Sequence, residues 1–404
     1  MFSCKTPPFF GTIFNFKKTL IKSVFKEVIM KNLSLAILAS VLIIVLLLLN
    51  FGFLDKPQIE EAPDFFVGID VAYDNIKEIK KLADEVSSYT NLFVIGSRGI
   101  THNYTRLDET CQYLYDKGLS FLVYREHRAP QSEWLETAKE KWGERFLGFY
   151  AYDEVGGWQL DNQEYKAVYD ADNATHAANQ FVNNMDQILR SFTRPYTNET
   201  SFPLFTSDYA LYWFDYKAGY DVVFAEFGWN YSRQLNIALD RGAATIQNKD
   251  WGVMITWTYN NPPYIESGAE LYKDMILAYN NGAKYILVFD TNKNYTRGIL
   301  KEEHLAALRQ FWNYTKKSPR TIQALSERVA FVLPEDYGYG FRGPNDKIWG
   351  FWEADALSLE ISHHLGNFLE EYGTNLDIIY ADDIKLSELY SKYIFWNGTI
   401  IEDS

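Results

Sequence analysis

Two apolar runs of the sequence end directly in carboxylic acids. The run 146–151 is followed by Asp153 and Glu154, and the run 222–225 is followed by Glu226. A carboxyl group can donate a proton, and a carboxylate can accept one or attack as a nucleophile, so a pair of them suits acid–base or nucleophilic catalysis. Because adjacent residues of a strand face opposite ways, we prefer Glu154 for the chemistry and Asp153 as an orienting partner. Glu154 and Glu226 are therefore the candidate catalytic residues.

Two glycines, Gly156 and Gly157, follow Glu154. Since glycine has no Cβ, they would let the backbone turn sharply and leave room for a ligand. Ligand binding without turnover, or a structural salt bridge with Arg98 or Arg125, is the alternative role for the two glutamates.

The pattern around these acids predicts a parallel (β/α)8 barrel over residues 65–318. Short apolar runs alternate with amphipathic segments, which is typical of βαβ units, and eight strands close a barrel. The predicted strands are Phe65–Ala72, Leu92–Gly96, Leu119–Tyr124, Phe146–Ala151, Leu204–Ser207, Val222–Ala225, Gly252–Thr256 and Tyr285–Phe289. The clearest predicted helices are 76–86, 107–114, 171–192, 233–241, 269–279 and 300–314, whereas 209–220 is short and aromatic. In such a barrel the active site lies at the carboxyl ends of the strands, where both glutamates fall.

Hydrolysis of a glycosidic bond is one reaction that uses two carboxyl groups, one as acid and one as nucleophile or base. Strands four and six lie near enough across a barrel mouth to supply the pair. A catalytic pair should lie roughly 5 to 10 Å apart across an open cleft, whereas a structural pair would be buried or directly paired.

Further polar and aromatic side chains follow the predicted strands. They are candidates for binding a substrate, the acids by hydrogen bonds and the aromatic rings by stacking on a sugar. The alternative is that these acids tie loops together and that these aromatic rings plug the end of the barrel. The candidates are Asp70, Asp153, Asp208, Asp290, Trp229, Trp257 and Tyr259.

These motifs together resemble a (β/α)8 glycoside hydrolase. The resemblance rests on a fourth strand ending in Tyr-Asp-Glu before Gly-Gly, an acid after strand six, an aromatic-rich strand seven and an appended α/β unit. It covers about residues 65–396 as architecture and assigns no individual family. Many retaining barrel glycosidases carry Asn-Glu after strand four, where this chain has Asp153-Glu154. The resemblance implies a carbohydrate substrate and leaves the acid and nucleophile roles of Glu154 and Glu226 exchangeable.

The overall charge argues against nucleic acid as a partner. The chain has 53 acidic and 39 basic residues, a formal net charge of -14, and no basic stripe beyond its N-terminus. Phosphate backbones are bound by basic surfaces. No Gly-x-Gly-x-x-Gly or Walker loop and no His-Glu-x-x-His spacing occur, so we expect neither a nucleotide cofactor nor a metal.

The N-terminal region predicts a membrane anchor. A basic segment, 1–32, precedes the apolar segment 33–54, which is long enough to cross a bilayer. The positive-inside rule then keeps 1–32 in the cytoplasm and places the chain after the linker 55–64 outside. The predicted location is the cell membrane, with one pass. A signal peptide read from Met30, followed by secretion, is the alternative.

Seven Asn-x-Ser/Thr sequons follow the anchor, which fits exposure outside the cell and suggests an archaeal surface glycoprotein. They are Asn103, Asn173, Asn198, Asn230, Asn294, Asn313 and Asn397.

A small second α/β unit is predicted for residues 319–404. Its strands would be 328–333, 376–380 and 393–396, with a helix at 354–369. It resembles the start of a flavodoxin-like layer and is too short for a complete one. The sequence therefore favours a surface-anchored glycoside hydrolase-like enzyme without cofactor, and a non-catalytic glycan-binding or structural barrel is the alternative.

Overall fold

The structure is a computed structural model that describes residues 64–126, 132–193, 202–381 and 389–402, together with Lys26, Met30, Lys31, Asn32 and Ser40. The chain divides into two units, 1–63 and 64–404. The predicted anchor, 33–54, lies outside the described residues apart from Ser40, so it stays a prediction. Among the helices that the structure describes, none combines the length and the apolar content needed to span a bilayer.

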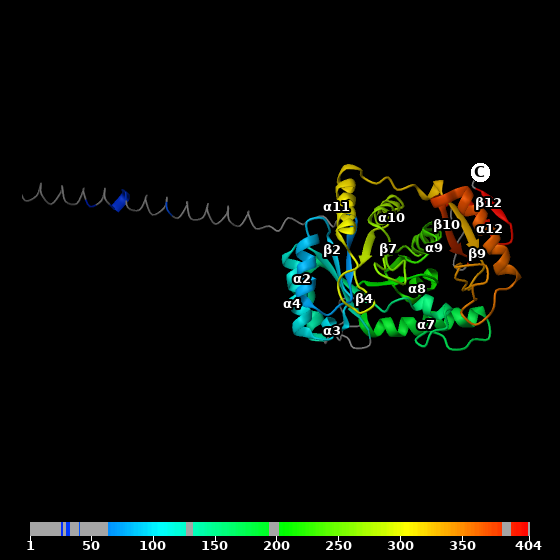
Figure 1. The fold of residues 1–404 in the computed structure, drawn as a ribbon, viewed down its shortest axis with the longest axis horizontal. Helices are drawn as coiled ribbons and strands as arrows, with labels where there is room; N and C mark the ends of the chain where they lie inside the picture. Colours follow the sequence, from blue (N-terminus) through cyan, green and yellow to red (C-terminus); the bar gives the residue numbers. More distant parts are fainter. Residues whose placement is uncertain are drawn as a thin grey trace, which may run out of the picture. The chain divides into compact units, whose positions relative to one another are not determined.

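Eight parallel strands close a barrel, as predicted (Figure 1). Neighbouring strands pair in sequence order, and the first strand closes the ring by pairing with the eighth, with Gly68 opposite Leu287. The observed bounds are β1 Phe66–Val71, β2 Leu92–Ile95, β3 Ser120–Arg125, β4 Phe146–Ala151, β5 Leu204–Asp208, β6 Val222–Phe227, β7 Asp250–Ile255 and β8 Tyr285–Phe289.

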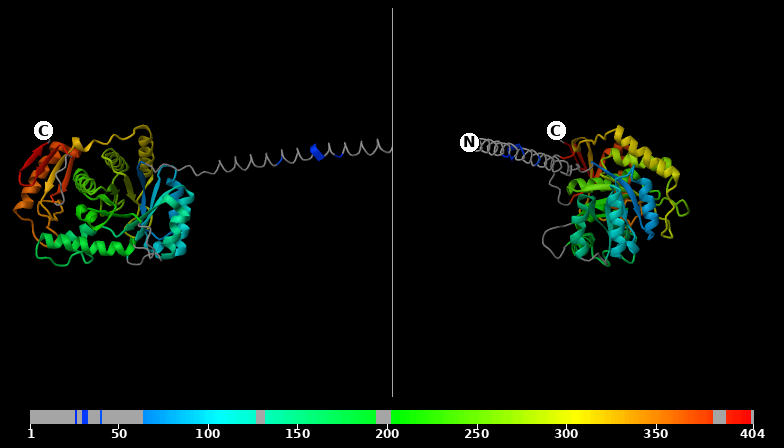
Figure 2. Two further views of the ribbon diagram at one scale, coloured as in Figure 1. Left: turned by 180° about the vertical axis from the view of Figure 1, so that it is seen from behind. Right: turned by 90° about the vertical axis from the view of Figure 1, so that its left-hand side faces the viewer.

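Helices surround the barrel on its outer side, which two further views also show (Figure 2). The helices are α2 Ile76–Val86, α3 Arg98–Thr101, α4 Tyr104–Asp116, α5 Ser132–Trp142, α6 Val155–Leu160, α7 Ala174–Thr193, α8 Tyr212–Ala218, α9 Arg233–Ile246, α10 Gly268–Asn280 and α11 Glu302–Lys317, with a 3-10 turn at Gly143–Arg145. The aromatic segment of the fifth unit forms α8, a short helix whose side chains are almost all buried.

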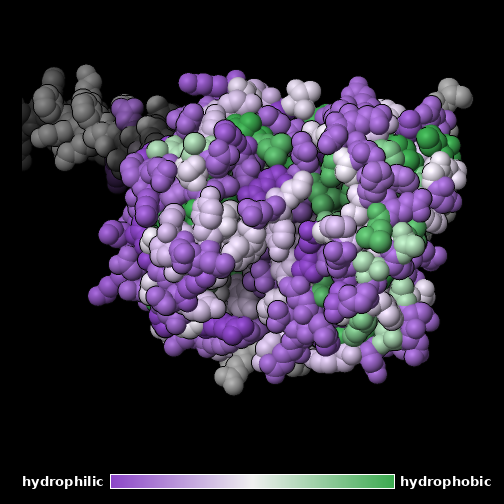
Figure 3. Space-filling model, turned by 45° about the vertical axis from the view of Figure 1, so that its right-hand side comes forward, coloured by the Kyte–Doolittle hydropathy of each residue, from purple (hydrophilic) through white to green (hydrophobic). Residues whose placement is uncertain are grey.

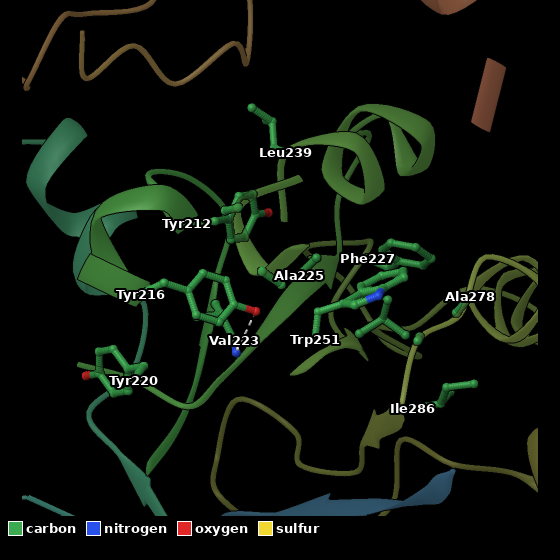
Figure 4. Close-up of a cluster of buried hydrophobic side chains, with 14 of the residues drawn as sticks. Tyr212, Tyr216, Tyr220, Val223, Ala225, Phe227, Leu239, Trp251, Ala278 and Ile286 are labelled. Atoms are coloured by element: carbon green, nitrogen blue, oxygen red, sulfur yellow. Dashed lines mark hydrogen bonds between the residues drawn. The ribbon is translucent and has the colours of Figure 1, made fainter. Parts of the chain in front are cut away.

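Alternation along the strands divides the core into two layers. Side chains such as Tyr150, Phe205 and Phe224 fill the barrel interior, because alternate residues of a barrel strand point inward. Their neighbours pack outward against the helices. Figure 4 shows this outer layer around β6, where the amide of Val223 donates to the Tyr216 hydroxyl at 3.2 Å.

The C-terminal unit is a small sheet with one α-helix among the described residues, as expected for an incomplete α/β layer. It comprises β9 Val329–Leu333, α12 Ala356–Tyr372, β10 Leu376–Tyr380, β11 Lys392–Phe395 and β12 Ile400–Glu402, with 3-10 turns at Leu325–Glu327 and Gly373–Asn375. The strand order is β10-β9-β11-β12, and only β12 runs antiparallel.

A buried ion cluster joins this unit to the barrel. Arg241 on α9 donates to Asp377 at 2.7 Å, and Arg328 lies 3.4 Å from the same carboxylate. Gly242 allows the close approach, because a Cβ there would meet the backbone oxygen of Ile378 at 2.3 Å.

The outer face drawn in Figure 3 is mostly hydrophilic, with separate apolar patches.

Candidate active site

A cavity of about 640 Å³ opens where the barrel strands end. It collects residues from several strand ends, which is the usual place for the active site of this fold. Six of its lining residues carry the argument: Asp70, Asp153, Glu154, Ser207, Glu226 and Trp257. The two candidate catalytic glutamates therefore share one cavity, as the sequence predicts.

Glu154 enters the cavity from a sharp bend after β4. Tyr152 and Glu154 adopt positive φ angles of 58° and 54°, a conformation that is unfavourable for residues with a Cβ and that concentrates at functional sites. The Glu154 amide donates to the Ser207 carbonyl at 2.9 Å. Because the chain has already left strand geometry, Asp153 and Glu154 both line the cavity instead of facing opposite ways.

The expected role of the two glycines needs correction. Gly156 and Gly157 lie in the helix α6 and neither has a positive φ, so the sharp bend belongs to Glu154. Their missing side chains allow close packing instead: a Cβ at Gly157 would meet the Tyr209 ring at 2.0 Å, and one at Gly156 would meet the Ala210 oxygen at 2.5 Å. The two glycines therefore let α6 pack closely against the loop after β5.

The carboxylate of Asp208 joins the start of α6 to the loop after β5. It accepts the backbone amides of Gly156, Gly157, Tyr209 and Ala210 at 2.5 to 3.0 Å. Asp208 is fully buried and is not among the residues that line the cavity. It holds the start of α6, and therefore Glu154, in place.

The hydroxyls of Tyr150 and Ser207 link Asp153 to Glu226. Ser207 Oγ lies 2.8 Å from an oxygen of Asp153, 2.8 Å from an oxygen of Glu226 and 2.8 Å from the Tyr150 hydroxyl, which donates to Asp153 at 2.5 Å. Ser207 has a single hydrogen and can donate to only one of the two carboxyls. A proton on Glu226, donated to Ser207, would complete the network.

Glu154 and Glu226 line the same cavity, and each influences the pKa of the other. An oxygen of Glu154 accepts the indole N–H of Trp158 at 3.1 Å. Glu226 is 4% exposed, whereas Glu154 is half-buried at the cavity wall.

Burial and mutual repulsion favour the protonated forms of these acids. Burial raises the pKa of Glu226 well above its ordinary value, and the charges of Glu154 and Asp153 raise it further. Burial and the charge of Asp153 likewise raise the pKa of Glu154, while the hydrogen bond from Trp158 opposes that rise. The pKa of both carboxyls is therefore raised, and the indole N–H of Trp158 is a donor that stabilises the charged form of Glu154.

Two of the other substrate-binding candidates face the cavity. Asp70 is 3% exposed, and its Oδ1 has no hydrogen-bond partner among the described residues. Burial and the charge of Asp153 raise its pKa well above the ordinary value. Trp257 is held by a bond from its indole N–H to the Thr291 carbonyl at 2.8 Å.

The last three candidates lie outside the set that lines the cavity. Asp290 is buried and accepts the Leu300 amide at 3.0 Å, so it ties a loop. Trp229 and Tyr259 are 36% and 53% exposed on the loops after β6 and β7.

Arg98, one of the two arginines considered as a salt-bridge partner of the catalytic glutamates, pairs instead with Glu126 at 2.8 Å. Sequence reasoning missed Tyr150, Ser207 and Trp158. An inward-facing hydroxyl near the end of a strand, as at Ser207, is the one signal that could have found them. In the described part of the chain, no three His, Cys, Asp or Glu side chains are grouped so as to hold a metal ion.

The sequon asparagines within the described residues lie on the surface. All that the structure describes are exposed, whereas Asn198 lies outside the described residues. Asn230 is on the loop after β6 that begins beyond Glu226. Glycosylation stays a prediction.

Comparison with known proteins supports the fold. No family model matches the chain. The GH5_18 glycoside hydrolase of Streptomyces cattleya, solved with GlcNAc, aligns over 84% of this chain and all of its own, with a TM-score of 0.55 and 10% identity. A variant of it, solved with Manβ1-4GlcNAc, aligns over 83% of this chain and 99% of its own, with a TM-score of 0.54 and 9% identity. The chain thus has a glycoside hydrolase-like barrel.

One curated protein is similar over a short stretch. An acetaldehyde dehydrogenase from Brevibacillus brevis is 32% identical over 82 residues, which is 19% of this chain. The match spans about a quarter of that relative's length.

Proposed function

We propose that this chain is a membrane-anchored, outward-facing glycoside hydrolase that cleaves glycosidic bonds of an extracellular polysaccharide or glycan. The observation that carries the proposal is a pair of carboxyl groups, both with a pKa raised by burial, that line one cavity at the carboxyl end of a (β/α)8 barrel. Acid-assisted cleavage of a glycosidic bond uses this combination.

Glu226 would protonate the leaving oxygen, and Glu154 would act as nucleophile or activate a water molecule. Both carboxyls line the same cavity, so a sugar bound there would lie beside both. Asp70 lines the cavity and has a buried, unpartnered Oδ1 among the described residues, so it would accept a sugar hydroxyl. A buried acceptor left unpaired is unfavourable, so substrate binding would remove that penalty.

The substrate class that we propose is an uncharged chain of β-1,4-linked hexoses. This class is supported by the GH5_18 barrel, which shares the fold and was solved with Manβ1-4GlcNAc. Trp257 offers a flat apolar ring to a pyranose face at the cavity wall.

Hydrolysis can be detected without knowing which bond is cleaved. The full chain would be incubated with mannan, glucomannan and chitin oligosaccharides in water enriched in oxygen-18. A hydrolase places one heavy oxygen on the new reducing end at each cleaved bond, and mass spectrometry detects this label. Products without the label, or no products at all, would contradict the proposal.

The burial of Glu226, which is 4% exposed, also supports a second candidate, a barrel that binds glycan without turnover. In that case the same oligosaccharides would bind and remain intact. The anchor is tested separately, because a membrane protein stays with the membrane fraction after washing with carbonate, whereas a secreted protein does not.

A further inference from the structure

A second cavity, of about 810 Å³, lies beside the catalytic one along α7. Its lining includes Trp158, Tyr165, Lys166, Tyr169, Asn184 and Gln187, and we name it the α7 groove. Four residues line both cavities, namely Arg98, Tyr124, Asp153 and Trp158. The α7 groove and the catalytic cavity are therefore neighbouring parts of one cleft.

Exposed aromatic rings distinguish the α7 groove from ordinary surface. Tyr165 and Tyr169 are 71% and 68% exposed. The Tyr169 hydroxyl donates to the Glu164 carbonyl at 3.0 Å, which limits its rotation, and Lys166 lies 5.4 Å from its ring centre. Rings held open to solvent are suited to stacking on the C–H faces of sugars.

Trp158 connects the α7 groove to the catalytic pair. Its ring lies 6.3 Å from that of Tyr165, and its indole N–H donates to Glu154 at 3.1 Å. An occupant that packs between Tyr165 and Trp158 would press on the side chain that orients Glu154.

The charges of the α7 groove are balanced. It contains two cations, Arg98 and Lys166, and two acids, Glu126 and Asp153. Arg98 is bound to Glu126 at 2.8 Å, and Lys166 donates to Asn162 at 2.5 Å. Because the cations already have partners and Asn184 and Gln187 add amide groups, an uncharged, hydroxyl-rich occupant fits best.

We infer that the α7 groove binds the continuing sugar units of the same chain that is cleaved at Glu154 and Glu226. This inference rests on the proposed function, and it adds where the further sugar units of the substrate chain would lie. The groove has a volume of about 810 Å³. Ligand pockets usually measure about 300 to 1,000 Å³, so the groove leaves room for such units.

The test compares binding of long and short chains to the full protein. Calorimetry would measure the affinities for β-1,4-mannohexaose and mannobiose, and for chitohexaose and chitobiose, in the Glu226→Gln background so that nothing is hydrolysed. We expect at least one hexasaccharide to bind about ten times more tightly than its disaccharide. Tyr165→Ala should reduce that ratio by about 3- to 10-fold, the worth of one aromatic stacking contact.

Tyr115→Ala is the matched control, because Tyr115 is an exposed tyrosine on α4 that lines neither cavity. It should leave the ratio unchanged. A ratio near one in the parent, no binding of either hexasaccharide, or equal effects of Tyr165→Ala and Tyr115→Ala would overturn the inference. Turnover of the wild-type chain is measured beside it: binding through Tyr165 without cleavage would refute only the proposed function, and cleavage with a ratio near one would refute only the α7 groove.

Discussion

Replacing Glu154 with glutamine should increase the free energy of unfolding at alkaline pH, although it removes a candidate catalytic group. Burial and the charge of Asp153 raise the pKa of Glu154 from 4.5 to about 8. One pKa unit corresponds to about 1.4 kcal/mol, so that rise corresponds to at most about 5 kcal/mol. Glu154 is only half-buried and interacts with Glu226, so we expect a gain of about 1 to 3 kcal/mol.

The sign of the effect follows from the direction of the pKa change. A carboxyl whose pKa is raised on folding opposes folding only when it is ionised, so its penalty is absent below the unfolded pKa and grows as the pH rises through the folded pKa. Wild type and Glu154→Gln should therefore have the same Tm near pH 4. At pH 9 the variant should melt about 2 to 6 °C higher, at about 2 °C per kcal/mol.

Differential scanning calorimetry across this pH range measures the effect directly. Glu109→Gln is the control, because Glu109 is 51% exposed and pairs with Lys80 on the surface. It should change the free energy of unfolding by less than about 1 kcal/mol. A lower Tm for Glu154→Gln at pH 9, or a gain that does not depend on pH, would show that the carboxyl is not held in an unfavourable environment.

Three more predictions concern acids and packing. Asp153→Asn removes a charge that raises the pKa of both catalytic glutamates, so both limbs of the pH profile of kcat/KM should move about one unit lower; an upward shift would contradict this. Asp377→Ala leaves two arginines in a buried site without their carboxylate and should lower the free energy of unfolding by about 3 to 5 kcal/mol in urea titrations, whereas a loss below 1 kcal/mol would refute it. Trp349→Ala, at a fully buried ring, should lose about 3 to 5 kcal/mol and Trp349→Phe clearly less, and equal losses would argue against a packing role.

The barrel could be predicted because each strand is a short apolar run between polar segments. The errors lie at the strand ends. β6 continues through Glu226 to Phe227, and β7 begins two residues earlier than expected, at Asp250. Backbone pairing with neighbouring strands extends a strand into polar residues, and a sequence pattern does not reveal that pairing.

The site was predictable only in part, because strands buried on both faces show no clear alternation. Asp208 and Glu226 both lie near the ends of apolar strands, yet only Glu226 is in phase with inward residues such as Phe224. Asp208 is in the outward phase and binds amides of α6. Trp158 reaches Glu154 only because the chain bends at Glu154 itself. No residue type at that position predicts the bend.

Glycosidic turnover by the full chain and by Glu154→Gln and Glu226→Gln tests the catalytic assignment most directly. Each variant keeps the shape of its side chain and removes its acid–base chemistry, so each should lose at least about 100-fold in kcat while the affinity for a β-1,4-linked hexasaccharide is largely kept. Glu109→Gln should remain as active as the wild type. Turnover that survives in either variant at the wild-type rate would show that the reaction does not depend on this pair of carboxyls.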